Sequence, residues 1–116
     1  MTETATTKPS PRKANPTTAV LADVKIERKA LGDEPRPLGG GLRPERARLH
    51  YNREADRWAE IATARALIDR AGWDAELLAT LNRAIGAADP TVARAGLIEV
   101  AALAVAAAEQ IDQAAP

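Results

Sequence analysis

Residues 89–112 read DPTVARAGLIEVAALAVAAAEQID, and this stretch carries the strongest structural signal in the chain. Asp89 can accept hydrogen bonds from the free amides of a first helical turn, and Pro90 suits that turn because its missing N–H costs nothing there. Apolar side chains then recur at helical spacing on two neighbouring faces: Leu97, Val100, Ala101, Ala104, Ala108 and Ile111, and beside them Ile98, Ala102 and Val105. Since Leu103 and Ala106 lie on the far side, a helix over residues 90–112 would be apolar nearly all round, which is typical of burial on more than one side.

A helix is also predicted upstream, over about residues 44–71. Pro44 suits its first turn, and Glu45 beside it favours the positive end of the helix dipole. A broad apolar face follows at helical spacing, and Gly72 after the run is typical of the left-handed residue just past a helix end.

A further helix is predicted between these two, over about residues 75–87. Asp74 is the expected N-cap, and Trp73 just before it can pack on Leu78 as a hydrophobic staple. Together the three segments predict an all-α fold in which residues 42–116 form a small three-helix body.

The first 41 residues are expected to form an extended, largely disordered Pro- and Gly-rich arm. Residues 1–18 are polar and Pro-rich, so they bury too little apolar surface to offset the entropy of ordering. Residues 32–44, with three prolines and four glycines, are typical of a linker. The short apolar patch at 19–31 fits a helix and a strand equally well, so its conformation stays open.

Composition excludes several classes of function. The chain has no cysteine, which excludes a disulfide scaffold, a thiolate nucleophile and a cysteine zinc site. The single histidine, His50, excludes a histidine-pair metal motif, and no second group is placed to orient its imidazole for acid–base chemistry. Asp56 and Glu60 alternate with arginines on a helical surface and predict a salt-bridged, solvated face. We therefore predict no catalytic residue, no cofactor and no metal site.

The distribution of charge and hydropathy limits the partners. Sixteen basic and sixteen acidic residues cancel, and the predicted helix 75–87 has Arg83 as its only base, so nucleic acid is not an expected partner. The longest run without charged or strongly polar side chains, 100–108, has nine residues, whereas a membrane span needs about 20. We expect a cytoplasmic protein without a membrane partner. Residues 1–50 hold ten basic and six acidic residues, so a basic arm could bind a polyanion or the acidic remainder of a neighbour.

Several segments resemble the small all-α MazG-like nucleotide pyrophosphohydrolases, particularly those of actinobacteria and their phages. The likeness lies in Leu77-Leu78, Asp89-Pro90, Arg94, and residues 97–106, 109–112 and, more weakly, 53–60. The resemblance implies an all-α oligomer in which acidic residues of two helices hold Mg²⁺ against a nucleoside triphosphate. The matching positions here are Ala79, Thr80 and Arg83 on one helix, and Gly96 and Glu99 on the next. With Glu99 as the single vestigial candidate, the resemblance implies the fold without the metal chemistry.

We therefore predict a non-catalytic helical interaction or assembly protein that self-associates or docks on a protein partner. A three-helix body of this length, rich in alanine, is near the lower limit for a self-sufficient core. The predicted protein interface is Val100, Leu103, Ala104, Val105 and Ala107. The predicted arm-docking residues are Val20, Leu21, Val24, Ile26 and Leu31.

Two other functions stay open. One is a divergent Mg²⁺-dependent nucleoside triphosphate pyrophosphohydrolase of the MazG-like type. The other is a structural component of a virion or another large assembly, which would then be virion-associated. Arginine usage and the 27 alanines indicate a GC-rich genome, which is compatible with an actinobacterium or a phage.

Overall fold

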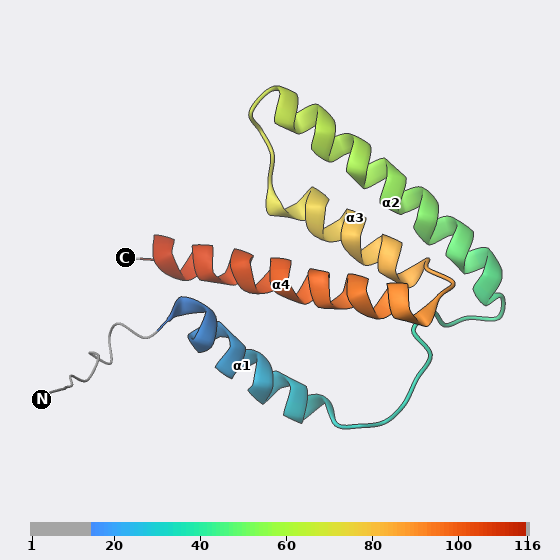
Figure 1. Cartoon of the computed structure of the whole chain (residues 1–116), viewed down its shortest axis with the longest axis horizontal. Coiled ribbons are helices and arrows are strands. Elements are labelled where there is room, and N and C mark those ends of the chain that lie inside the picture. Colours follow the sequence, from blue (N-terminus) through green and yellow to red (C-terminus); the bar gives the residue numbers. More distant parts are fainter. Residues whose placement is uncertain (1–14, 116) are drawn as a thin grey trace, which may run out of the picture.

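The residues that the computed structural model describes, 15–115, form α-helices joined by loops, with no β-strand in that range (Figure 1). Its four helices there are α1 (Pro16–Leu31), α2 (Pro44–Leu67), α3 (Trp73–Ile85) and α4 (Pro90–Ala114). The all-α prediction is confirmed. The predicted number of helices, three, is wrong, because a helix forms inside the expected arm. The expectation of disorder for residues 1–14 falls outside the described residues.

The unexpected helix, α1, is defined by the residues at its two ends. The Asn15 side chain accepts a hydrogen bond from the backbone N–H of Thr17 at 2.8 Å, and Pro16 occupies the first turn. At the other end Gly32 has a φ of +76°, which glycine adopts without strain. An Asn-Pro start is the same type of signal as the Asp-Pro pair at 89–90, so it was present in the sequence. The apolar patch at 19–31, which fitted a helix and a strand equally well, is therefore helical.

The turn between α2 and α3 differs from the prediction. α2 ends four residues before position 71, and Asp69 makes the turn with a φ of +57°, a left-handed conformation that aspartate tolerates. The backbone N–H of Arg70 donates to the carbonyl of Arg65 at 2.8 Å and closes the turn. Gly72 is extended and is itself the N-cap of α3. The predicted roles of Gly72 as the end of α2 and of Asp74 as an N-cap are therefore wrong.

The start of α4 is as predicted. The Asp89 side chain accepts a hydrogen bond from the backbone N–H of Thr91 at 2.9 Å, and Pro90 occupies the first turn. The loop before it packs on α2, where the Asn52 side-chain amide donates to the carbonyl of buried Gly86 at 3.4 Å. The α3–α4 connection is thus fixed at both of its ends.

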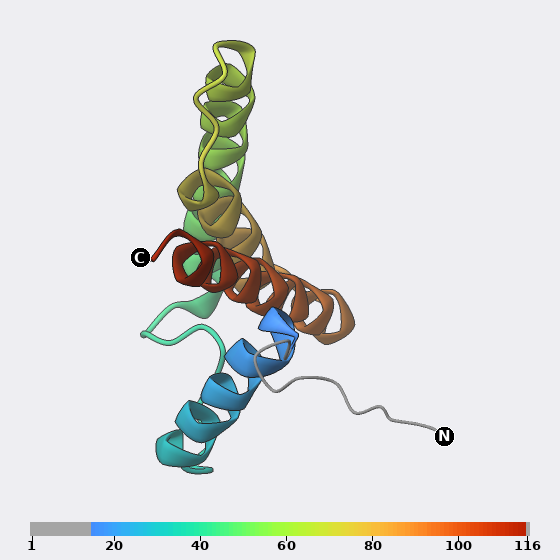
Figure 2. The same cartoon turned by 90° about the vertical axis from the view of Figure 1, so that its left-hand side faces the viewer.

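The four helices pack in a row and not as a closed bundle. Within the described range α3 packs on α2 and on α4, α1 packs on α4 alone, and α2 does not contact α4. Figures 1 and 2 show the order α2, α3, α4, α1, with α1 diverging from α4 toward its own C-terminal end. The radius of gyration is 18.7 Å, compared with about 13 Å for a compact domain of similar length. A row of this kind leaves both of its broad faces uncovered.

Small side chains make up the buried core. The buried hydrophobic residues are Val20, Ala55, Ala75, Ala79, Ala84, Ala93 and Val105. No side chain larger than valine is buried among the described residues, whereas Leu67, Ile68 and Ile111 are 84%, 70% and 71% exposed. The fold thus brings helices close together without enclosing its large apolar side chains.

Candidate functional site

Four of the five positions that the family resemblance singles out line one shallow groove between α3 and α4, and the fifth, Ala79, is buried beside it. Thr80 and Arg83 line it from α3, and Gly96 and Glu99 line it from α4. Its volume of about 190 Å³ is below the roughly 300–1,000 Å³ of common ligand pockets. Among residues 15–115, no three acidic or histidine side chains are close enough to hold a metal ion. The groove therefore combines one carboxylate with one guanidinium.

α4 meets α3 along a face of small residues. A Cβ atom built on Gly96 would lie 2.8 Å from the Cβ atom of Ala84, so the two backbones approach closely there. Half-buried Val100, Leu103 and Ala107 follow Gly96 at helical spacing. These three members of the predicted interface therefore lie on the face that α3 of the same chain already covers.

α1 covers a second face of α4. Val20 of α1 and Val105 of α4 are both buried, and the Thr17 hydroxyl donates to the Glu109 carboxylate at 2.7 Å. Leu21 lines an apolar groove beside this contact, together with the α4 residues Ile98, Ala101, Ala102 and Ala106. Val105 of the predicted interface is thus covered by α1 of its own chain.

The predicted arm-docking patch is divided by this contact. Val20 is its one buried member, while Leu21 and Val24 are about half exposed and Ile26 and Leu31 are 64% and 68% exposed. The C-terminal part of α1 diverges from α4 (Figure 2). Most of the patch therefore remains open after α1 has packed on its own chain.

The third face of α4 has no covering helix within the described range. We call it the open stripe, and it consists of Leu97, Ala101, Ala104, Ala108 and Ile111. Ala108 is half-buried, and Ala101 lies at the border with the groove beside α1. Leu97 is 36% and Ile111 is 71% exposed, and Ala104 is the one member of the predicted interface that lies here. Sequence reasoning placed all five residues on one helical face, but neighbouring faces were equally apolar, so it did not single out the open one.

Polar contacts reinforce the helix pairs near the α2–α3 turn. Arg65 donates to both carboxylate oxygens of Asp74, at 3.1 and 2.9 Å, and so ties the end of α2 to the start of α3. The indole N–H of Trp73 donates to the Gln110 side-chain oxygen and joins the start of α3 to the end of α4. The hydrogen bonds from Arg65 and from the Ala75 amide lower the pKa of Asp74 below its ordinary value.

Replacing Arg65 by methionine is expected to raise the pKa of Asp74 toward its ordinary value, because the largest cause of the shift is removed. The pKa of Asp74 is lower in the folded state than in the unfolded state. The Arg65–Asp74 pair therefore stabilises the fold at pH values above the unfolded-state pKa, and this stabilisation is lost as the pH falls through the folded-state pKa. The wild-type chain should therefore exceed the variant in stability at neutral pH and lose that advantage in acid. A carboxyl NMR titration and acid unfolding curves measure the two effects, with Arg70→Met as the control. An unchanged Asp74 pKa would contradict the assignment.

The remaining aromatic side chains lie on α2. Trp58 is half-buried, and the guanidinium carbon of Arg57 lies 5.3 Å from the centroid of its ring, a cation–π contact. His50 is exposed and packs edge-on against Tyr51, with ring centroids 5.3 Å apart. No acidic side chain contacts the His50 ring among the interactions of the described residues.

Comparison with protein-family models, with curated proteins and with solved structures finds no match to this chain. By length and composition alone, α4 could cross a membrane, because charged residues are sparse along it. The uncharged run at residues 100–108 is too short to indicate such a span, which becomes apparent only over the whole length of the helix. Only a small part of the apolar length of α4 is buried within the chain. The most prominent surface of the molecule is thus the uncovered apolar part of this helix.

Proposed function

We propose that this protein is a non-catalytic helical assembly protein that self-associates and completes its core by doing so. The observation that carries the proposal is the size of the buried side chains: among the described residues alanine and valine are buried and no larger side chain is, while large apolar residues such as Ile26, Leu67 and Ile111 stay exposed on α1, α2 and α4. Burying a large aliphatic side chain contributes about 1.5–3 kcal/mol, whereas alanine offers little apolar area. A second layer of helices would bury the large apolar side chains that a single row leaves exposed, and would gain the free energy of their burial.

The arrangement of the helices supports the same function. α2 and α4 flank α3 without meeting, so no central core forms between them as it would in a bundle. Exposed large apolar residues lie on both ends of the row, on α1 and on α2. Extended apolar surfaces of this kind mark interaction sites in folded proteins.

Sedimentation velocity and thermal unfolding of the full chain test this function. Over a range from about 1 to 100 µM we expect the mass to rise above the 12.3 kDa of one chain and the Tm to rise with concentration, since association stabilises the folded state by mass action. A 12.3 kDa species with a constant Tm across the range would contradict the proposal.

The groove that contains Glu99 provides a second candidate, Mg²⁺-dependent hydrolysis of nucleoside triphosphates. What favours it is that Thr80, Arg83, Gly96 and Glu99 share this groove, as the resemblance implies. One carboxylate beside a guanidinium is a poor anchor for a divalent cation. Release of pyrophosphate from a panel of deoxynucleoside triphosphates with Mg²⁺, abolished by Glu99→Gln, would establish this activity. Absence of turnover would eliminate it.

A further inference from the structure

We infer that the occupant of the open stripe is the α4 helix of a second copy of this chain, running antiparallel to the first. The inference rests on the proposed self-association and names the surface and the geometry. Leu97, Ala101, Ala104, Ala108 and Ile111 are separated by four, three, four and three residues. This is the seam spacing of a two-stranded coiled coil, in which two helices pack their apolar stripes together.

The sizes of the side chains favour the antiparallel direction. In a parallel pair Leu97 would meet Leu97 and Ile111 would meet Ile111, so the bulky layers would hold the helices apart over the alanines between them. In an antiparallel pair centred between Ala101 and Ala104, Leu97 faces the partner's Ala108 and Ala101 faces the partner's Ala104. Leu97 then meets a small residue at each end of the pair, and Ile111 lies beyond it, level with the partner's Arg94. The small central layers permit close approach, which keeps the packing continuous.

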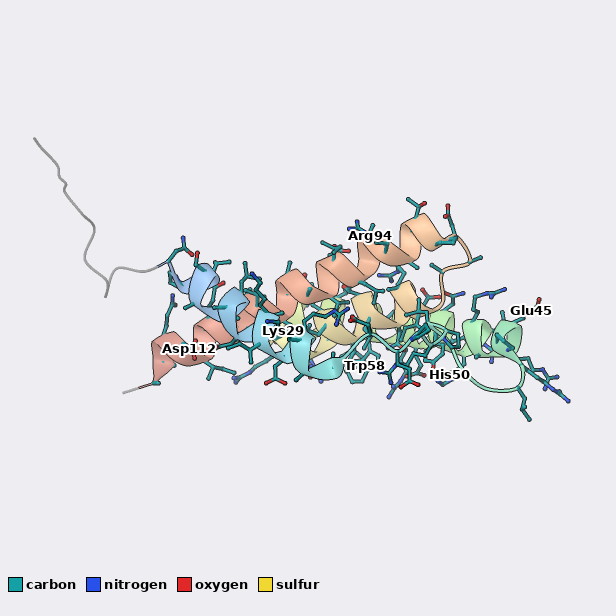
Figure 3. The ribbon with its side chains drawn as sticks, turned by 90° about the horizontal axis from the view of Figure 1, so that it is seen from below. Lys29, Glu45, His50, Trp58, Arg94 and Asp112 are labelled. Atoms are coloured by element: carbon teal, nitrogen blue, oxygen red, sulfur yellow. The ribbon has the colours of Figure 1, made fainter. Side chains whose placement is uncertain are left out.

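The charges beside the stripe favour the same direction. Arg94 and Asp112 are 18 residues apart, which is five turns of about 3.6 residues, so both flank the stripe on the same side. They lie at opposite ends of α4 (Figure 3). An antiparallel pair brings Arg94 next to the partner's Asp112, and the two-fold symmetry repeats this contact at the other end. A parallel pair would place Arg94 level with the partner's Arg94, across the seam, and about five turns away from the partner's Asp112.

Neither flanking charge takes part in an ion pair with another residue of the range 15–115. The ion pairs among the described residues are Arg28–Asp33, Arg57–Glu54 and Arg65–Asp74, and none of them involves α4. Arg94 and Asp112 are exposed, and the two covered faces of α4 point toward α3 and α1. The stripe and its flanking charges therefore form one self-complementary surface on the side that the row leaves open.

Charge reversal in the full chain tests the pairing. Arg94→Asp and Asp112→Arg should each weaken dimerisation by about tenfold or more, because two attractive contacts per dimer become repulsive. The double variant should return the dissociation constant to about the wild-type value. The matched control is Arg53→Asp, which makes the same change in charge on α2, a helix that does not contact α4. Sedimentation equilibrium measures the dimer dissociation constants of all four variants and of the wild-type chain.

Failure of the pairing and failure of the proposed function give different results. Wild-type chain that associates, with dissociation constants unchanged in both single variants, would overturn the antiparallel α4 contact and leave self-association standing. Wild-type chain that stays monomeric would overturn both.

Disulfide trapping gives an independent readout of direction, since the chain has no cysteine of its own. A mixture of the Ala101→Cys and Ala104→Cys chains should form the mixed disulfide in excess over either homodisulfide. Homodisulfides in excess would overturn the antiparallel register.

Discussion

Replacing Gly96 by leucine is expected to separate α3 from α4 and to cause the largest loss of stability of any single substitution considered. A Cβ atom at this position would already lie 2.8 Å from the Cβ atom and 3.3 Å from the Cα atom of Ala84. Overpacking costs about 1–3 kcal/mol and sometimes more, and exceeds the gain in helix propensity of roughly 0.8 kcal/mol. We expect a net loss of about 2 kcal/mol or more, which would lower the Tm by roughly 8–16 °C.

Two comparisons separate this close contact from a general effect of a bulky residue. Ala95→Leu changes the exposed neighbouring position and should leave the Tm nearly unchanged. The pair Gly96→Ala with Ala84→Gly moves one methyl group from α3 to α4, and the double variant should be more stable than the sum of the single variants predicts. Thermal unfolding followed by circular dichroism measures these effects. Equal Tm values for Gly96→Leu and Ala95→Leu would show that the helices do not meet closely at this point.

Replacing Val20 by aspartate is expected to release α1 from α4 and to unfold it. Val20 is the buried residue of α1, and a carboxylate there would lose the apolar contact and be desolvated. A helix of 16 residues is only marginally stable in water without tertiary contacts. Amide hydrogen exchange should show loss of protection over α1 and retained protection in α3. The far-UV helical signal should fall by about a fifth, the share of α1 among the helical residues.

The matched control is Ile26→Asp, which introduces the same carboxylate at a position that is 64% exposed. It should leave α1 protected, because no tertiary contact is lost. Protection of α1 in the Val20→Asp chain equal to that in the control would contradict the contact with α4 and would mean that the capping residues alone stabilise this helix.

Local signals account for where the helices begin. Asp89 and Pro90 predicted the start of α4 correctly, and Pro44 predicted the start of α2. Asn15 and Pro16 carry the same information for α1, within a stretch of polar residues whose composition predicted disorder. Such signals can be found in a sequence because a capping side chain bonds to amides only two or three residues away.

Two other features are not indicated by these capping signals. α2 ends early because Asp69 adopts a left-handed turn, and the Arg65–Asp74 pair joins the helices on either side of it. The predicted interface of α4 contained residues of three different faces, since alanine and valine surround the helix and periodicity does not rank one apolar face above another.

The amino-acid sequence by itself determined that this protein is helical, where most of its helices start, and that its apolar residues are mostly too small to fill a core. The tertiary structure alone decided that the helices form an open row, that α1 packs on α4, and which stripe of α4 remains uncovered. The physical reason is the range of the interactions. Caps and helical periodicity act within a few residues, whereas the choice of face is made by contacts such as Ala84 with Gly96 and Thr17 with Glu109, which exist only after distant segments have come together.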